Sequence, residues 1–451
     1  MKWPPVTLIV LNWNAGETLS DCLRALLAQD YPDFQVVVVD NASTDDSPAH
    51  VAARFPQVIL MRNDENRGFA AGNNTGLRAS DAPFAVLVNP DVIVDPGWLQ
   101  ALIAPMIADE TIGIAGCKLF FPGKEKLNHA GGFMQMPQAF PGHYGGGQPD
   151  DGAHQAQRDV AYVIGAVMAL RREMLDRIGL LDEGFFLYYE DADLCVRAQR
   201  VGYRVVYLPQ ATAVHIESIT TDRKSDFYWR WMSVSRWRYL LKHGASQQLL
   251  HESLPAEMSW LPKQGTQVRQ AAAHAYRQTV LSLPAIWRDR ARDGMPPLPG
   301  AEQAAVAAGL HQLRRLAWQP VTQQLTALAA QSQVRERPFR SNMPLIGSAV
   351  AACRALWNSV ATKWYVRPML EQQNRFNHQL VWRLQVQAEQ LLAQEQGQAD
   401  LVEDISVLTQ ELQEMNRLLR SIDERLAQLE SARSSTDAGR HSTCAGAHHD
   451  E

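Results

Sequence analysis

The chain has 451 residues, of which 46% are hydrophobic and 20% charged, and its formal net charge is −5. A chain of this length is usually too long to fold around a single hydrophobic core, so we expect at least two domains. Acidic and basic residues are interspersed, and the five cysteines are odd in number and widely spaced, which argues against a nucleic-acid partner, a zinc site and a disulfide framework.

The first 240 residues or so alternate between patterns typical of strands and of helices. Apolar, β-rich runs and segments with apolar residues at helical spacing follow one another in the order 6–11, 18–29, 35–39, 48–55, 58–62, 72–79 and 84–88. This strand–helix order predicts an α/β fold with a mostly parallel, twisted sheet that has helices on both faces.

Two aspartates end strands of this predicted sheet. Asp40 follows the second strand and Asp91 follows the fourth, at the carboxyl edge where open α/β sheets bind ligands. Asp40 could contact a nucleobase or a ribose, or it could cap the next helix. Asp91 is a candidate ligand for Mg²⁺ or Mn²⁺, which commonly bridge one or two carboxylates to substrate phosphates. Between them, the glycine-spaced segment 66–76 suits either an anion at a helix N-terminus or close contact of helix and sheet.

A second acidic cluster lies about a hundred residues further along. Segment 121–159 is rich in glycine and proline, and we interpret it as a long irregular loop, either a functional lid or a disordered insertion. Glu190, Asp191 and Asp193 then begin an amphipathic helix. The helix dipole could explain them, or one of them could take a proton from an attacking hydroxyl. His215 follows the next strand-like run, and a lone histidine of this kind is structural or a metal ligand.

The second half of the chain carries different patterns. Residues 246–370 are predicted to be largely helical, with breaks at Pro284 and at 296–300, and segment 344–365 could lie at a membrane interface or against neighbouring helices. Heptads between Leu401 and Leu429 favour a coiled coil between chains over a helix that folds back on its own chain. The predicted divisions are therefore a catalytic domain, a helical region, a coiled coil and a disordered tail at 1–245, 246–370, 371–430 and 431–451.

Taken together and in this order, the motifs of the first half resemble family 2 glycosyltransferases of the GT-A fold, in particular the bacterial rhamnosyltransferase-like branch. The matching segments are 10–14, 39–45, 66–74, 87–91, 165–166 and 185–197, followed by His215. The resemblance extends over about residues 5 to 240. It departs from the family at Asn89, where the Asp-x-Asp motif has its first acid, and asparagine is a poorer metal ligand than aspartate.

The resemblance implies an inverting transferase that moves a sugar from a nucleotide-diphospho-sugar, such as dTDP-rhamnose, to a hydroxyl of a glycan or lipid-linked acceptor. It implies that Asp191 is the general base with Glu190 beside it, and that Asp91 and His215 hold a divalent metal, Mg²⁺ or Mn²⁺. The donor-binding residues that it implies are Asn12, Asn14, Asp40, Asn66, Gly68, Asn73, Asn89 and Asp91. It also favours a role in cell-surface polysaccharide biosynthesis at the inner face of the membrane. Independently of the resemblance, the widely spaced cysteines fit a reducing cytoplasm, and the heptads predict a homo-oligomer held through the coiled coil.

Two other functions fit parts of the pattern. A nucleotidyltransferase also combines a doubly wound sheet with a carboxylate-held metal, but it usually opens with a glycine-rich loop that carries Lys or Arg, and residues 12–17 contain neither. An assembly scaffold would use the heptads. Because both Asp91 and Asp191 are present, we expect scaffolding to accompany the enzyme activity and not to replace it.

Overall fold

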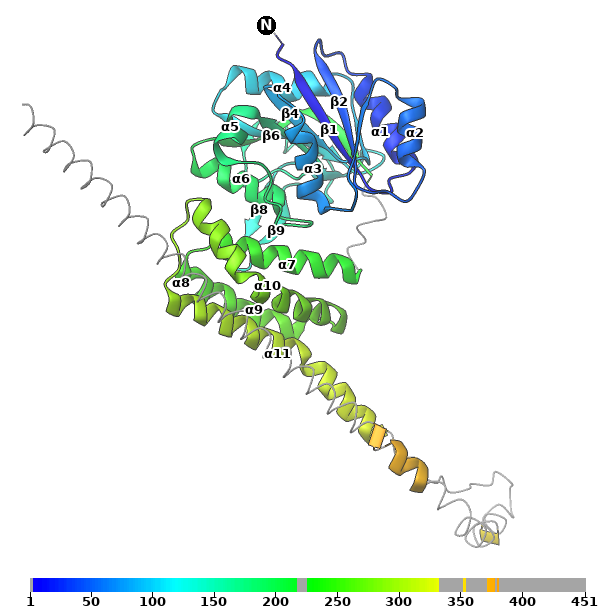
Figure 1. The fold of residues 1–451 in the computed structure, drawn as a ribbon, viewed down its shortest axis with the longest axis vertical. Coiled ribbons are helices and arrows are strands. Elements are labelled where there is room, and N and C mark those ends of the chain that lie inside the picture. The colour runs from blue at the N-terminus through cyan, green and yellow to red at the C-terminus, as the bar shows by residue number, and fades with distance from the viewer. Residues whose placement is uncertain (1–2, 217–224, 332–351, 354–370, 378, 381–451) are drawn as a thin grey trace, which may run out of the picture. The chain divides into compact units, whose positions relative to one another are not determined.

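The computed structural model describes residues 3–216, 225–331, 352–353, 371–377 and 379–380, the last residues of the long stretch 225–331 by backbone only. Residues Met1–Gln323 form one compact unit, and Gln324–Glu451 form a second one. The first unit includes residue 245, the predicted boundary, and it contains both the sheet and the helices that follow it (Figure 1).

A mixed, mostly parallel sheet forms the centre of the first unit. Its main strands lie in the order β10-β12-β6-β11-β4-β1-β2-β3, while β5 pairs with β12 and β7 with β6. The strands are β1 (Val6–Asn12), β2 (Phe34–Asp40), β3 (Ile59–Arg62), β4 (Phe84–Val88), β5 (Val92–Val94), β6 (Ile112–Phe120), β7 (Leu127–His129), β10 (Arg158–Asp159), β11 (Val167–Arg171) and β12 (Arg204–His215). The predicted strand–helix alternation and parallel sheet are confirmed, and β11 is antiparallel to both of its neighbours.

Helices cover both faces of this sheet, as the continuous apolar strands require. They are α1 (Glu17–Leu27), α2 (Ser47–Arg54), α3 (Gly68–Arg78), α4 (Trp98–Ala108), α5 (Arg172–Ile178) and α6 (Glu190–Arg200). Leu8 and Val10 of β1 share a core cluster with α1 and α4. The alternate residues Ile9 and Leu11 face α3 so closely that a methyl group on Gly76 or Gly72 would lie 2.6 Å or 2.5 Å from them. The lack of a side chain at these two glycines therefore allows α3 to pack closely against β1.

Segment 121–159 is not the irregular loop or disordered insertion that we predicted. It contains β7 and β10 and a separate two-stranded sheet of β8 (Gly132–Gln135) and β9 (Phe140–His143). The turn of this hairpin is held by distant helices, because Arg236 Nη1 donates to the Gln138 carbonyl at 3.0 Å and Ser253 Oγ to the Pro137 carbonyl at 2.6 Å. A prediction based on patterns of neighbouring residues cannot detect contacts between residues so far apart in the chain.

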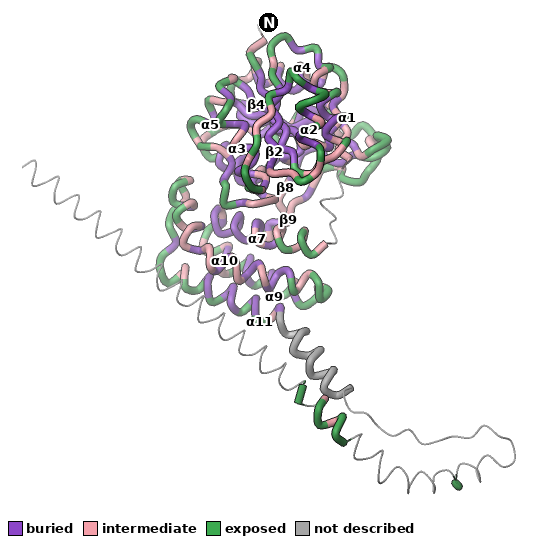
Figure 2. Tube along the Cα trace, turned by 45° about the vertical axis from the view of Figure 1, so that its right-hand side comes forward, coloured by how far each residue is buried: buried purple, intermediate pink, exposed green. Residues whose placement is uncertain are grey.

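The helical region begins with α7 (Asp226–His243), which lies between the sheet and α10 (Figure 1). It continues with α8 (Ser246–Gln248), a π-helical turn (Leu249–Ser253), α9 (Leu254–Trp260), a short 3₁₀ turn (Leu261–Lys263), α10 (Thr266–Arg292) and α11 (Gly300–Gln331). The prediction of helices is confirmed, but α10 runs through Pro284 without ending there. Buried residues lie along the inner sides of these helices (Figure 2).

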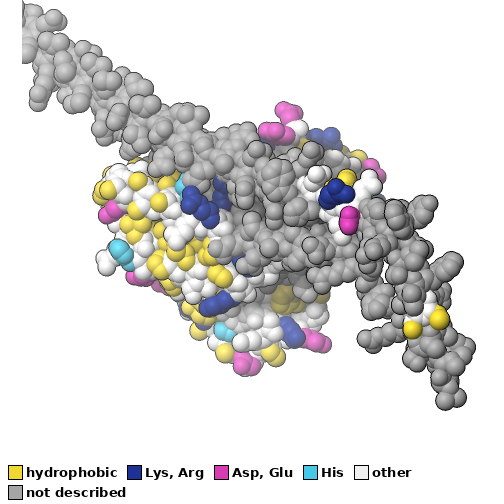
Figure 3. Space-filling model, turned by 90° about the horizontal axis from the view of Figure 1, so that it is seen from below, with side chains coloured by type: hydrophobic (Ala, Val, Ile, Leu, Met, Phe, Trp, Pro, Cys, Tyr) yellow, Lys and Arg dark blue, Asp and Glu magenta, His cyan; other side chains and the backbone are white. Residues whose placement is uncertain are grey.

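Parts of the second half lie outside the described residues. These are the heptads between Leu401 and Leu429, the tail from 431, and segment 344–365 apart from residues 352–353. Residues 371–377 are helical. In the described ranges, none of the helices has the length and apolar character needed to cross a membrane. On the face seen in Figure 3, the described surface carries scattered acidic and basic side chains, some of them next to one another, and hydrophobic side chains gather on part of it.

Candidate active site

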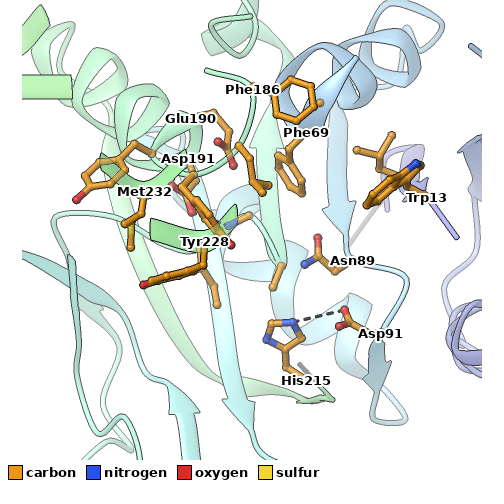
Figure 4. A pocket seen from close by; sticks show the side chains of 18 of the residues that line it. Trp13, Phe69, Asn89, Asp91, Phe186, Glu190, Asp191, His215, Tyr228 and Met232 are labelled. Atoms are coloured by element: carbon orange, nitrogen blue, oxygen red, sulfur yellow. Dashed lines mark hydrogen bonds and ion pairs between the residues drawn. The ribbon is translucent and has the colours of Figure 1, made fainter. Parts of the chain in front are cut away.

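A cavity of about 550 Å³ opens beyond the carboxyl ends of β1 and β4. Its walls come from the N-terminal ends of α3, α6 and α7, from β12, and from the β8–β9 hairpin. Of the residues predicted for the site, those that line it are Asn14, Asn66, Gly68, Asn89, Asp91, Glu190, Asp191 and His215. Figure 4 shows the acid pair near 190 and the Asp91–His215 pair on different sides of this one space. A cavity of this size with convergent polar groups is typical of a small-molecule site.

The acid pair is presented by a tight turn. Tyr188 and Tyr189 have φ angles of 70° and 68°, a left-handed conformation that is disfavoured for bulky residues and often found at functional sites. Tyr189 is held because its hydroxyl donates to the Ala139 carbonyl of the hairpin turn at 2.7 Å. The helix α6 then begins at Glu190, so Glu190 and Asp191 are its first two residues and both border the cavity.

The two carboxyl groups of the pair have different surroundings. Asp191 Oδ2 accepts a hydrogen bond from the Gly165 amide at 2.9 Å, and Oδ1 accepts one from the Ala192 amide at 2.7 Å. Burial raises the pKa of Asp191, while these amide bonds oppose the rise. Glu190 is 4% exposed, and its Oε2 atom has no hydrogen-bond partner among the described residues. Burial and the charge of Asp191 hold the pKa of Glu190 well above its ordinary value. Of the two groups, Glu190 is therefore the one whose protonated form is favoured more strongly, while the two amide bonds favour the ionised form of Asp191.

Asp193, the third acid of the cluster, does not face the cavity. It is 0% exposed, and Arg197 Nε and Lys242 Nζ lie 2.8 Å and 2.6 Å from its carboxylate oxygens. Burial alone would raise the pKa of Asp193, but these two cations hold it well below its ordinary value. Asp193 therefore fastens α6 to α7 and does not serve as a base.

The second pair, Asp91 and His215, is brought together by strand pairing. Asp91 directly precedes β5, and β5 is antiparallel to β12 with His215 opposite Val92. His215 Nε2 lies 3.4 Å from Asp91 Oδ1, and both side chains are largely buried. Within the described part of the chain, no group of three His, Cys, Asp or Glu side chains could hold a metal. Asp91 and His215 thus offer two ligands, which fits a cation whose other ligands are substrate phosphates and water.

Three predicted donor residues lie behind the cavity wall and not on it: Asn12, Asp40 and Asn73. Asn12 Nδ2 donates to Asp40 Oδ1 at 3.0 Å across the parallel pair β1–β2. Asn73 Nδ2 donates to the carbonyl of Phe69, one turn earlier in α3. The helix that follows β2 has Asp46 at its N-cap position, so Asp40 does not cap it.

Gly68 allows the glycine-spaced segment 66–76 to contact the turn before the acid pair. Its φ is 76°, and a methyl group there would lie 2.4 Å from the Phe186 carbonyl oxygen, which accepts from the Phe69 amide at 2.7 Å. Gly97 has a similar φ of 75°, but a methyl group on Gly97 would have no atoms within 4 Å. The two glycines share a backbone conformation and differ in their surroundings.

We expect Gly68→Ala to lower stability and transfer rate more than Gly97→Ala does. Each substitution forces alanine into the left-handed region, which costs about 1–2 kcal/mol. Only Gly68→Ala also meets a backbone atom, which adds about 1–3 kcal/mol of overpacking. Urea unfolding and initial transfer rates of both variants measure the difference. Equal effects at the two positions would show that the close contact with Phe186 is unimportant.

Sequence reasoning missed most of the aromatic lining. Trp13 is 40% exposed at one end of the cavity, and the other aromatic side chains of the lining are those of Phe69, Tyr162, Phe186, Tyr188, Tyr189, Phe227 and Tyr228. Asn128 and His143, from the segment predicted to be a loop, also line the wall. Several of these rings lie inside the segments 10–14, 66–74 and 185–197 that resemble the family, and the aromatic run 227–231 outside them was a further signal in the sequence.

The comparisons agree with the resemblance. A family model described as glycosyltransferase like family 2 matches residues 4–239, and one described as glycosyl transferase family group 2 matches 151–330. The O-antigen biosynthesis protein RfbC of Myxococcus xanthus is 30% identical over 233 residues, which are 49% of this chain and 18% of that protein. The N-acetylglucosaminyl-diphospho-decaprenol L-rhamnosyltransferase of Mycobacterium tuberculosis is 28% identical over 241 residues, 48% of this chain and 77% of that protein.

Two solved structures also resemble this chain. A mannosyltransferase from Pyrobaculum calidifontis in complex with GDP-Man and Mn²⁺ aligns with 84% of this chain and 88% of its own, at 19% identity and a TM-score of 0.39. The S. aureus protein TarS, residues 1–349 in complex with UDP, aligns with 69% of this chain and 91% of its own, at 17% identity and a TM-score of 0.38.

Proposed function

Because this chain belongs to glycosyltransferase family 2, we propose that it transfers a sugar from a nucleotide-diphospho-sugar to a hydroxyl of a glycan or lipid-linked acceptor, with inversion at the anomeric carbon. The observation that carries this proposal is that the Glu190–Asp191 pair and the Asp91–His215 pair border one cavity. The first pair suits removal of a proton, and the second suits a cation beside a diphosphate.

The chemical step assigned to the chain is a single displacement. Asp191 takes the proton of the acceptor hydroxyl, and the oxygen attacks the anomeric carbon from the face opposite the diphosphate. The bond between that carbon and the diphosphate oxygen breaks, and the nucleoside diphosphate leaves with the electron pair. Glu190 keeps its proton throughout. The carbon passes through an oxocarbenium-like state, as in glycoside hydrolysis.

The charge around the cavity supports a divalent metal. Among the described residues that line it, none is Lys or Arg, whereas Asp91, Glu190 and Asp191 are acids. A diphosphate would therefore meet no permanent cation among these described lining residues. Mg²⁺ or Mn²⁺ held by Asp91 and His215 would supply the positive charge that stabilises the departing diphosphate.

The donor nucleotide is assigned to the end of the cavity near Trp13. The indole offers a partly exposed aromatic face, and Asn14 and Asn66 lie on the same lining. The relative from Mycobacterium tuberculosis is named a rhamnosyltransferase, which supports dTDP-rhamnose as the first donor to test. The coiled coil, the homo-oligomer and the membrane contact remain predictions, because the segments on which they depend lie outside the described residues.

The proposal is tested by identifying the products. The full chain is incubated in the presence of Mg²⁺ or Mn²⁺ with one nucleotide-sugar at a time: dTDP-rhamnose, UDP-N-acetylglucosamine or GDP-mannose. Each incubation is made with and without short glycans or lipid-linked sugars. We expect one donor to release nucleoside diphosphate in an acceptor-stimulated reaction. Release of pyrophosphate would indicate a nucleotidyltransferase, and no cleavage of any nucleotide-sugar would contradict the proposed function.

We expect Asp91→Asn to weaken metal-dependent nucleotide binding about 10-fold or more, which corresponds to at least about 1.4 kcal/mol. The asparagine keeps the volume of the side chain but removes the charge that would hold the metal. Calorimetric titration with thymidine diphosphate and Mn²⁺ measures the change, and wild-type protein with EDTA is the control. Binding that is equally strong with EDTA and in the variant would remove the metal from the proposal.

A further inference from the structure

The turn of the β8–β9 hairpin, residues 136–139, is held by side chains from three different elements. Figure 1 shows this hairpin beside α7. The carbonyls of residues 137, 138 and 139 accept, in this order, from Ser253 Oγ at 2.6 Å, Arg236 Nη1 at 3.0 Å and the Tyr189 hydroxyl at 2.7 Å. Ser253 and Arg236 belong to the helical region, whereas Tyr189 directly precedes Glu190. Hydrogen bonds on successive peptide groups therefore join the helical region to the acid pair.

Both partners of the last of these hydrogen bonds have an unusual backbone. The φ angle is 54° at Ala139 and 68° at Tyr189. Residues with a side chain disfavour this left-handed region, and they persist in it where the surrounding contacts leave no alternative. The hydrogen bonds to carbonyls 137–139 are contacts of this kind, so we expect the shape of the turn to depend on its donors.

Arg236 can hold its carbonyl firmly because it is itself held. Its side chain is 1% exposed, and Nη2 is paired with the carboxylate of Glu257 in α9, which is 0% exposed. The hydroxyl of Tyr276 in α10 donates to the same carboxylate at 2.7 Å. The guanidinium also lies over the ring of Phe140, 4.5 Å from its centroid. Burial alone would raise the pKa of Glu257, but Arg236 holds this pKa below its ordinary value, so the pair is charged at neutral pH.

The charge of this pair favours a role in positioning over a role in stability. A buried ion pair adds little net stability over hydrophobic side chains of similar volume, because both charges must lose their water. Hydrophobic side chains could not, however, donate a hydrogen bond to carbonyl 138. The arginine supplies this donor, and the glutamate neutralises its charge and fixes its direction.

We propose that Arg236, oriented by Glu257, is a positioning residue for the Glu190–Asp191 pair and acts on it through the hairpin turn and Tyr189. The inference rests on the proposed function, because the position of the acid pair matters to the reaction if Asp191 takes a proton from the acceptor. Arg236 is not among the residues that line the cavity, so it acts only through other residues. The helices that carry Arg236 and Glu257 are accordingly part of the catalytic unit.

The positioning role is tested on the full chain with Arg236→Met/Glu257→Gln, which removes both charges of the pair together. The new amide oxygen can still accept from Tyr276, so no charge is left unpaired and the fold should be retained. Hydrogen exchange is measured by mass spectrometry in segment 132–143, which contains the hairpin, and in segment 185–195, which contains the acid pair. We expect exchange in both segments to be about five-fold faster than in the wild type, the effect of losing one hydrogen bond of typical strength.

Arg171→Met is the matched control, because Arg171 is also buried and donates to backbone carbonyls, those of Ile112 at 2.9 Å and Asp109 at 3.1 Å. It pairs with Phe84 at the amino end of β4, whereas the cavity opens beyond the carboxyl end. The control should leave exchange in both segments unchanged. Faster exchange in segment 132–143 alone, or an equal change in the control, would overturn the link to the acid pair. Should the double variant fail to unfold cooperatively, Ser253→Ala replaces it, since it removes only the hydroxyl that holds carbonyl 137.

Reaction rates supply the second measurement. With the nucleotide-sugar that the wild type cleaves among dTDP-rhamnose, UDP-N-acetylglucosamine and GDP-mannose, we expect kcat of the double variant to fall about 10- to 100-fold, the upper value being the cost of a displacement of about 1 Å. The KM for the nucleotide-sugar should change little, since Trp13 and Asn14 follow β1. Tyr189→Phe, which removes only the hydroxyl bonded to carbonyl 139, should lower kcat in the same way.

Combining Tyr189→Phe with the double variant should lower kcat little further, because both changes act through one series of contacts. Losses that multiply in the combined variant, or an unchanged kcat in the double variant, would overturn the positioning role. If the wild type cleaves none of the three nucleotide-sugars, the proposed function fails, and the exchange comparison alone decides whether Arg236 holds the turn.

Discussion

Replacing Asp191 by asparagine should lower the turnover of sugar transfer by about 10²- to 10⁴-fold, the contribution that a positioned general base typically makes. The amide keeps the size of the side chain and can still accept from the Gly165 amide, so the turn and α6 should remain intact. It cannot take the proton of an acceptor hydroxyl. The measurement is kcat at saturating donor, with thymidine diphosphate affinity determined on the same preparation. We expect the affinity to change little.

Glu190→Gln is the matched comparison for this variant. Burial and the charge of Asp191 favour the protonated form of Glu190, and an amide reproduces the shape and charge of that form. We therefore expect a loss of less than about 10-fold, well below the contribution of a general base. The rate should also depend on pH in a defined direction. Burial raises the pKa of Asp191, and the base must be ionised to act, so turnover should fall as the pH is lowered through that raised pKa. The opposite ranking, with Glu190→Gln inactive and Asp191→Asn active, would exchange the two roles.

The sheet and the positions of Asp91 and His215 at its edge could be predicted because they depend on local signals. Apolar runs that are buried on both faces identify parallel strands, and a polar residue directly after such a run lies at the carboxyl edge. Asp91 lies between β4 and β5, and His215 is the last residue of the long strand β12. Because β5 pairs with β12, the two residues come close together. Their proximity therefore follows from order along the chain and from strand pairing.

Other features depend on contacts between distant residues and could not be predicted. Asn12 and Asp40 end neighbouring strands as expected, but they turn toward each other and not toward the cavity. The left-handed turn at Tyr188–Tyr189 depends on the Ala139 carbonyl, about fifty residues earlier in the chain. The helical region, for which the sequence suggested no chemistry, supplies Arg236 and Ser253 to the same hairpin turn. The helical region therefore helps to fix the position of the Glu190–Asp191 pair.

The side chain of Lys242 in α7 links that region to α6 through buried ion pairs. It is 0% exposed, and its Nζ lies 2.6 Å from Asp182, 2.6 Å from Asp193 and 2.8 Å from Asp293. These acids come from the segment before α6, from α6 itself and from the end of α10. One ammonium group therefore joins three elements, and its removal would leave buried carboxylates with fewer cations.

We expect Lys242→Met to lower the free energy of unfolding by about 3–5 kcal/mol, the cost of removing one partner from a buried ionic network. That is a large part of the roughly 5–15 kcal/mol by which domains are usually stable. Lys124→Met is the matched control. Lys124 Nζ lies 2.6 Å from Asp95, but its side chain is 44% exposed, so its loss should cost no more than about 1 kcal/mol. Urea unfolding of both variants gives the comparison.

The dependence of this loss on pH distinguishes lost charge compensation from lost contact area. In the wild type, Lys242 and Arg197 keep the pKa of Asp193 well below its ordinary value against the effect of burial. Without Lys242, burial should raise the pKa of the network's carboxyl groups, and protonation would then remove the uncompensated charge. The difference in stability between wild type and Lys242→Met should therefore shrink as the pH falls from 7 toward 5. A difference that stays constant over this range would mean that Lys242 acts through the contacts of its alkyl chain and not through its charge.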